Sequence, residues 1–314
     1  MTRYIVQRLV QAVGVVLLVS VFVFALVRLI PGDPVSIMLG ENLSPEVERE
    51  LIRKWGLDRP IFEQYVAWLA NLVRGDLGQS IRTQESVGQL IAARIPATSM
   101  LAVGAMIIAI GIGIPAGVVA AYRANTGLDY AAMLAALVGL CVPSFWLGLL
   151  LMLLFSLRLG WFPVSGYVSP LDDLGASLRH LVLPALALGV GLSASISRMT
   201  RSAMLDVLRQ DYVRTARAKG LSERATVLGH ALRNALMPTI TVIGLQLGFL
   251  LGGSVVVEEI FGYPGVGQLL VFAINNRDYP LIQGVVMIFA LTFVIVNLLV
   301  DLSYAYLDPR IKYS

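Results

Sequence analysis

Several apolar segments, each long enough to cross a lipid bilayer, constrain this chain more than any other feature of its sequence. A transmembrane helix needs roughly 20 consecutive apolar residues, and five or six segments reach that length. The composition agrees, with 57% hydrophobic and 14% charged residues and a mean hydropathy of +0.78, which lies outside the range of soluble globular proteins. We therefore expect an all-α integral membrane protein.

Six transmembrane helices are predicted from the hydropathy pattern. Their expected ranges are about 10–30, 98–122, 130–157, 180–199, 238–257 and 281–302. The first segment could also be a signal peptide, but its apolar core exceeds the roughly 7–15 residues usual there and no small-residue cleavage site follows it. We expect a retained transmembrane helix that starts in the cytoplasm.

This topology divides the chain into four parts. They are a first transmembrane helix at 1–31, an extracytoplasmic helical insertion at 32–95, a five-helix core at 96–307 with a cytoplasmic loop at 206–236, and a cytoplasmic tail at 308–314. Short cytoplasmic loops of membrane proteins are enriched in Lys and Arg. Eight such residues lie between Arg198 and Arg233, which favours a cytoplasmic position for the loop and for both termini.

Small residues predict how the transmembrane helices pack. Gly244, Gly248 and Gly252 repeat every four residues, a pattern that permits close approach to another helix. Pro143 can kink the third helix, because neighbouring groups in a membrane protein can satisfy the backbone that a proline frees. Within the insertion, an aromatic stripe at helical spacing around Tyr65 is expected at the membrane interface or against a neighbouring helix.

Three polar residues inside transmembrane segments are candidates for a translocation path. Ser193 and Ser197 lie near the inner end of the fourth helix, and Gln246 lies in the middle of the fifth. Serine in a helix more often bonds its own backbone, and a lone glutamine can bond a neighbouring helix. Both interpretations remain open for these residues.

Signatures of a self-contained enzyme are absent from the sequence. There is no GxxxxGK[ST] loop, no HExxH, no GxSxG and a single cysteine, Cys141, with two histidines far apart. We expect no catalytic residue, no metal and no cofactor in this chain. The net charge of +4 follows from cations beside the transmembrane segments, so nucleic acid is not expected as a partner. An ion-coupled transporter would place ionisable groups in mid-membrane, whereas Glu258, Glu259 and Asp301 lie at segment ends.

The polar run from Asp211 to Pro238 stands out within this apolar chain. It carries five cationic residues and is interrupted by Gly220, which predicts two short helices with a bend between them. Ser222 can cap the second helix by accepting an amide hydrogen bond. A charged run of this kind is commonly a solvated loop, and a partner-binding loop is the alternative.

Motifs along the whole chain decide between these interpretations. In the run, Arg214-Thr215-Ala216, Gly220 and His230-Ala231-Leu232-Arg233 align with the pattern EAA, three residues, Gly, nine residues, I-x-L-P, although the glutamate and the proline of that pattern are missing. Further motifs are Leu29 to Pro34, Tyr212 to Gly220, Leu232 to Ala235, Glu258 to Gly267, Arg277 to Pro280 and Asp308 to Arg310. With these motifs the chain resembles the membrane permease subunits of ABC importers, in particular the dipeptide and oligopeptide group.

The resemblance implies a function and a set of partners. A permease of this group is a multi-pass protein of the bacterial or archaeal cytoplasmic membrane. It works with a second homologous permease, one or two P-loop ATPase subunits that bind ATP and Mg, and an extracytoplasmic substrate-binding protein, within membrane lipid. Peptides are the expected cargo, with glutathione, nickel or a sugar as alternatives, and an ion-coupled secondary transporter as the alternative from another class.

The resemblance also implies two groups of contact residues. Those expected to couple to the ATPase are Arg214, Thr215, Ala216, Arg217, Lys219, Gly220 and Leu221. Those expected to dock the binding protein are Asp33, Glu258, Tyr263 and Arg277.

Overall fold

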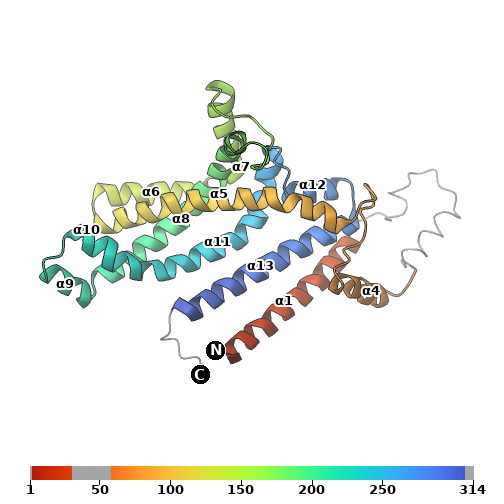
Figure 1. The fold of residues 1–314 in the computed structure, drawn as a ribbon, viewed down its shortest axis with the longest axis horizontal. Helices are drawn as coiled ribbons and strands as arrows, with labels where there is room; N and C mark the ends of the chain where they lie inside the picture. Colours follow the sequence, from red (N-terminus) through yellow and green to blue (C-terminus); the bar gives the residue numbers. More distant parts are fainter. Residues whose placement is uncertain (1, 30–57, 308–314) are drawn as a thin grey trace.

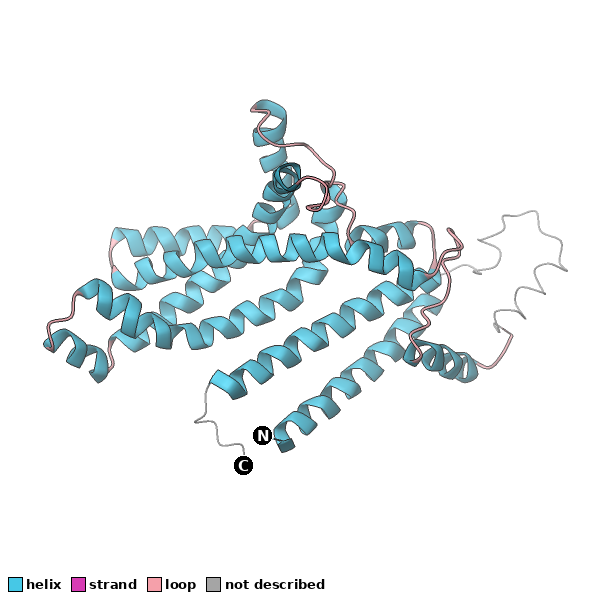
Figure 2. Ribbon diagram, in the orientation of Figure 1, coloured by secondary structure: helices cyan, strands magenta, loops and turns pink. Residues whose placement is uncertain are grey.

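The computed structural model describes residues 2–29 and 58–307, and within these ranges the chain is helical apart from loops and one isolated bridge between Gln79 and Ser86 (Figure 2). The prediction of an all-α protein is confirmed for this part of the chain. Asp33, a predicted docking residue, lies outside the described residues.

The helices run in chain order as in Figure 1. Their bounds are α1 Thr2–Leu29, α4 Ile61–Val73, α5 Val87–Tyr122, α6 Gly127–Cys141, α7 Ser144–Leu151, the π-helical η1 Met152–Arg158, α8 Leu174–Leu208, α9 Asp211–Ala218, α10 Glu223–Ala225, the π-helical η2 Thr226–Ala231, α11 Leu232–Ile260, α12 Val266–Asn275 and α13 Tyr279–Leu307.

Within the part of the chain that the structure describes, four uninterrupted helices, α1, α5, α8 and α13, are long and apolar enough to cross a membrane. Two bent pairs also pass, Gly127–Cys141 with Ser144–Arg158 and Glu223–Leu250 with Gly252–Ile260. Counting each bent pair as one span gives the six that hydropathy predicts. The helix boundaries extend further than the hydropathy pattern, since α5 begins at Val87, within the range expected for the insertion.

The third predicted span is broken at Pro143 rather than kinked. The two halves meet at 100°, because Val142 has an extended ψ of 120° and Pro143 a ψ of 135°. Proline disfavours helical geometry in the residue before it, so both residues leave the helix. In Figure 1 the segment after the break, α7 and η1, rises away from the layer formed by α5, α6 and α8.

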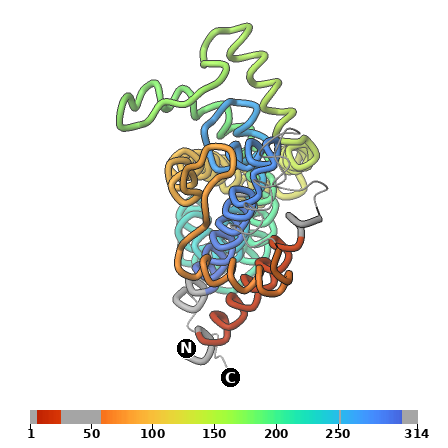
Figure 3. The backbone as a smooth tube through the Cα atoms, turned by 90° about the vertical axis from the view of Figure 1, so that its right-hand side faces the viewer, coloured from red at the N-terminus to blue at the C-terminus, as the bar shows by residue number. Residues whose placement is uncertain are grey.

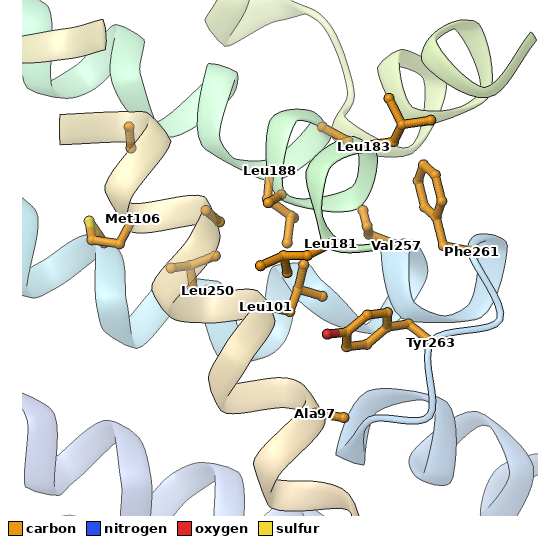
Figure 4. Close-up of a cluster of buried hydrophobic side chains, with 14 of the residues drawn as sticks. Ala97, Leu101, Met106, Leu181, Leu183, Leu188, Leu250, Val257, Phe261 and Tyr263 are labelled. Carbon is orange, nitrogen blue, oxygen red and sulfur yellow. The ribbon is translucent and has the colours of Figure 1, made fainter. Parts of the chain in front are cut away.

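The main core lies between α5 and α8, with α11 beside them (Figure 4). Leu101, Leu181 and Val257, one from each helix, are buried there together with Tyr263. Glycine allows the close approach: a Cβ at Gly117 would lie 2.5 Å from the Ser197 carbonyl oxygen, and one at Gly189 would lie 2.7 Å from that of Ala105. The α5–α8 contact is therefore a backbone-to-backbone contact, as expected for small residues in membrane helices.

The glycine repeat of α11 packs against α13. A Cβ at Gly244 would collide with Val300, and one at Gly248 would lie 2.7 Å from the Phe293 ring. The predicted close helix contact is confirmed at these two positions. At Gly252 a Cβ would meet nothing within 4 Å, so the repeat extends one step beyond the contact.

At the edge of the bundle, α1 packs on α13 and α4 (Figure 3). Arg8 forms an ion pair with Asp301 at 3.2 Å. The aromatic stripe of α4 faces α1, where Tyr65 and Trp68 lie 5.3 Å and 5.7 Å from Phe24 between ring centroids. The expectation that these aromatic side chains contact a neighbouring helix is confirmed.

Candidate functional site

The helix α9 has one buried face and one exposed face. Val213 and Ala216 are buried, and α9 packs through this face against η2. Arg214, Thr215 and Arg217 point outward and are exposed. The spacing of three between the buried residues matches one side of a helix, so the sequence presents its cations to the surroundings while its apolar side anchors α9 to the bundle.

The bend after α9 favours glycine. Gly220 has a φ of +78°, which L side chains adopt at a cost and glycine adopts readily. A Cβ there would meet nothing within 4 Å, so the constraint is conformational rather than steric. Ser222 then accepts a hydrogen bond from the Ala225 amide at 3.3 Å, which confirms the predicted cap.

The second helix of the loop is longer than predicted. From Glu223 the chain stays helical through α10 and η2 into α11, rather than forming a short independent helix. The reason is an apolar stripe, Val227, Ala231 and Ala235, that repeats every four residues and is buried against α5 and α8. The continuous helix therefore begins after the bend, at Glu223, and α9 contacts it through η2.

Exposed ion pairs and hydrogen bonds hold the loop together. Arg217 binds Glu223 across the bend, with its Nε 2.8 Å from Oε1, and Arg214 approaches Asp211 at 3.5 Å. Asn234 donates to the Tyr212 hydroxyl at 3.0 Å. Lys219 and Leu221 are exposed beside these residues. Six of the seven predicted coupling residues are exposed on this segment, whereas Ala216 is buried against the bundle. Their role in coupling stays a prediction.

A buried ion pair supports this end of the bundle. Arg201 of α8 donates from Nε and Nη2 to the two carboxylate oxygens of Asp129 in α6, at 2.6 Å and 2.7 Å. The Asp129 side chain is 1% exposed and also accepts from the Asn125 amide at 2.9 Å. The pair ties the 123–126 turn to α8. Sequence reasoning missed it because the partners are far apart in the chain.

At the opposite end of the bundle, the buried carboxyl group of Glu258 joins three helices. From α11 it accepts hydrogen bonds from the Thr98 hydroxyl of α5 at 2.9 Å and from the Gly267 and Gln268 amides of α12 at 2.7 Å and 3.1 Å. Gly265 at the N-cap of α12 has no side chain to cap the helix. Glu258 supplies the missing acceptor from a different helix.

The absence of side chains at Gly265 and Gly267 allows α11 and α12 to approach closely here. A Cβ at Gly265 would collide with the Glu258 carboxyl group, and one at Gly267 would lie 2.6 Å from the Val255 Cα. The hydroxyl of Thr98 in turn accepts from the Val266 amide at 2.8 Å. This arrangement, which we call the Glu258 node, consists of Glu258, Thr98, Gly265, Gly267 and Gln268.

A second buried carboxylate, that of Asp278, lies at the same end of the bundle. Asp278 is fully buried and accepts from the Ser80 hydroxyl, from the Ile81 amide at 3.1 Å and from the Leu281 amide at 3.3 Å near the start of α13. It therefore joins the loop before α5 to α13.

The predicted docking residues fall into two groups. The side chains of Glu258 and Tyr263 are 0% and 1% exposed, so neither can touch a docked protein in this conformation, and both serve the interior instead. Burial also raises the pKa of the Tyr263 hydroxyl, which keeps it protonated. Arg277 is exposed and has a φ of 51°; its docking role stays a prediction.

The predicted path residues are not gathered into one lining. Ser193 donates to the carbonyl of Val190 in its own helix at 2.7 Å, as serine in a helix commonly does. Ser197 is 2% exposed and lies where Gly117 of α5 approaches α8. Gln246 is half-buried on α11. Their role in a path stays a prediction.

The helical bundle, with an exposed cationic loop between its fourth and fifth spans, defines a multi-pass membrane protein. Residues 113–313 match the family described as binding-protein-dependent transport system inner membrane component, and residues 1–102 match the N-terminal region described for such membrane components. The chain belongs to this family, and it is a multi-pass inner-membrane protein.

Relatives match the chain from end to end. It is 44% identical over 335 residues to the di/tripeptide transport system permease protein DppB of Pseudomonas aeruginosa, with 100% of both chains covered. It is 47% identical to a putative peptide transport system permease protein of Brucella abortus, again over 100% of both. Identity is 43% to the oligopeptide transport system permease protein AppB of Bacillus subtilis, with 100% of both covered.

One solved structure shares the fold at low sequence identity. It is the inward-facing MetNI methionine ABC transporter, with a TM-score of 0.59, 17% identity, and coverage of 70% of this chain and 97% of that one. The likeness supports the helical arrangement described above.

Proposed function

We propose that this chain is one permease subunit of an ATP-driven ABC importer that carries di- or oligopeptides across the cytoplasmic membrane. The end-to-end relatives named as di/tripeptide, peptide and oligopeptide permeases support this cargo. In this proposal the chain itself hydrolyses no ATP. One or two separate ATPase subunits bind ATP and Mg²⁺, a second homologous permease completes the membrane pair, and a binding protein delivers the peptide.

The proposed orientation places α9 in the cytoplasm. The cationic residues between Arg198 and Arg233 support it, because short cytoplasmic loops are rich in Lys and Arg. In Figure 1, α1 begins and α13 ends toward the side on which α9 lies, so both termini would be cytoplasmic. The Glu258 node and α12 would then face the outside.

The single observation that carries the proposal is the two-faced construction of α9. Its outward face offers Arg214, Arg217 and Lys219 to carboxylates or backbone carbonyls of an ATPase, while Val213 and Ala216 are buried toward the bundle. A short helix anchored in this way can pass a rigid-body displacement to the spans on either side. We propose that α9 is the coupling helix of the importer.

Copurification and transport together test the assembly. The tagged chain, expressed in its native host and purified in mild detergent, is expected to bring a second permease and P-loop ATPases with it. In proteoliposomes, the complex is expected to take up peptide only with ATP and binding protein. Recovery of the chain alone, with uptake driven by a proton or sodium gradient, would sink the proposal in favour of a secondary transporter.

A matched pair of variants tests the coupling role. Because a Cβ at Gly220 meets open space and both Asp and Asn tolerate positive φ, Gly220→Asp and Gly220→Asn fit the fold equally well. Only Asp adds a negative charge to the cationic surface. We expect Gly220→Asp to lower ATP-driven uptake by about tenfold or more while Gly220→Asn stays near wild type. Equal uptake by the two variants would contradict a charge-dependent contact.

A further inference from the structure

An open cleft with both apolar and polar lining lies beside the Glu258 node, at the end of the bundle opposite α9. Its volume is about 360 Å³, within the roughly 300–1,000 Å³ of small-molecule sites. Helices α5, α11 and α12 contribute most of its lining. The residues that line it are Thr83, Leu90, Arg94, Glu259, Gln268, Leu269, Val271, Phe272, Asn275 and Asn276.

Two opposite charges line the cleft without pairing. Arg94 comes from α5 and Glu259 from α11. Among the described residues neither forms an ion pair, and Arg94 approaches only the Gln268 side-chain oxygen, at 3.5 Å. A cation and an anion held apart in one cleft can bind a molecule that carries both charges. The cation then faces the negative end of that molecule, and the anion faces its positive end.

The Glu258 node fixes the spacing of these charges. Arg94 lies one helical turn before Thr98, and Glu259 directly follows Glu258. The backbone amide of Gln268 donates to Glu258 at 3.1 Å while its side chain lines the cleft. The same hydrogen bonds that join α5, α11 and α12 therefore preorganise the cleft, which lowers the conformational cost of binding.

Neutral groups complete a lining suited to a peptide. Gln268, Asn275 and Asn276 offer amide donors and acceptors for a peptide backbone, and Phe272 and Leu269 offer apolar surface for side chains. We infer that this cleft is a binding subsite for the zwitterionic form of a short peptide, with Arg94 binding the terminal carboxylate and Glu259 the terminal ammonium. The inference rests on the peptide-import function proposed above and adds a ligand site within this chain.

Protection from labelling tests the subsite directly. Asn275→Cys is made in a Cys141→Ser background, in the complete transporter, and reacted with a membrane-impermeant maleimide. Millimolar trialanine is expected to slow labelling by about fivefold, whereas N-acetyl-trialanine amide, which has neither terminal charge, is expected to give no protection. Arg94→Gln or Glu259→Gln is expected to abolish the protection, since each removes one charge-assisted hydrogen bond. The exposed Arg82→Gln, outside the cleft lining, serves as control and is expected to keep it.

Transport selectivity gives a second readout. With the binding protein unchanged, Glu259→Gln is expected to reduce the preference for trialanine over N-acetyl-trialanine by about tenfold, and Arg94→Gln the preference over trialanine amide. If the wild-type complex takes up trialanine with ATP, but trialanine gives no protection from labelling and the variants keep the wild-type selectivity, the subsite is overturned. The proposed function would still stand. Loss of the second permease from the purified Arg94 or Glu259 variants would also overturn the subsite, because the cleft would then be a subunit contact. Absence of any ATP-driven peptide uptake by the wild-type complex would defeat the proposed function itself.

Discussion

The Glu258 node and the α9 loop, at opposite ends of the helical bundle, use charged residues in opposite ways. At the α12 end, Glu258 and Asp278 are buried and each accepts hydrogen bonds from two other elements. At the α9 end, the ion pair of Arg217 with Glu223 is 39% and 48% exposed, and the cations face outward. Buried polar groups with satisfied hydrogen bonds specify one arrangement, while exposed charges remain available to a partner. Buried carboxylates fix the helices at the α12 end, whereas the α9 loop keeps its charged groups accessible.

The largest loss of stability is expected from removing the Glu258 carboxyl group. In Glu258→Ala the amides of Gly267 and Gln268 and the hydroxyl of Thr98 lose their buried acceptor, so we expect a loss of about 3–5 kcal/mol in the free energy of unfolding. Unfolding by sodium dodecyl sulfate, followed by tryptophan fluorescence, measures this loss. The neighbouring exposed residue provides the control, because Glu259→Ala is expected to change stability by less than about 0.5 kcal/mol. Similar losses in the two variants would contradict the comparison.

An intermediate effect is expected at the buried ion pair behind α9. Asp129→Ala leaves Arg201 without its partner in a site where the Arg side chain is still 26% exposed, so we expect a loss of about 2–4 kcal/mol. The same denaturation measurement applies, with the exposed Asp206→Ala on α8 as control. If Asp129→Ala lowered the free energy of unfolding no more than the control does, the ion pair would not stabilise the α9 end. The two ends would then differ in rigidity more than the structure indicates.

The smallest effect on stability is expected in the loop itself. Arg217→Gln breaks an exposed ion pair, which is typically worth about 0–1 kcal/mol. A double-mutant cycle with Glu223→Gln measures this coupling energy. Under the proposed function the same variant lowers ATP-driven uptake more than its stability loss explains. A coupling energy above about 2 kcal/mol would show that the loop is a structural element rather than a free contact surface.

Hydropathy was sufficient to predict most of the fold, because crossing a bilayer demands long apolar helices. Gly244 and Gly248 likewise signalled the contact of α11 with α13. The size of the break at Pro143 was not predictable, since a proline can kink a membrane helix slightly or end it. Which outcome occurs depends on the backbone angles of Val142 and on what packs around the break.

The site was harder to predict, mainly because the sequence does not show which charged side chains are buried. Glu258 and Glu259 are adjacent and chemically alike, yet one is fully buried and the other exposed, because consecutive residues of an α-helix point about 100° apart. Asp129 in α6 and Arg201 in α8 are separated by two helical segments, α7 and η1, so no local pattern joins them. The pair of glycines at 265 and 267 was the available signal, since glycine marks places where another group approaches closely.

The packing of α1 against α13 has a consequence for how the protein is made. The two helices lie at opposite ends of the described sequence, yet Arg8 binds Asp301 and α1 rests mainly on α13. During synthesis α1 enters the bilayer long before α13 leaves the ribosome, so lipid or the insertion machinery must cover its packing face in the meantime. The bundle closes only when the last helix arrives.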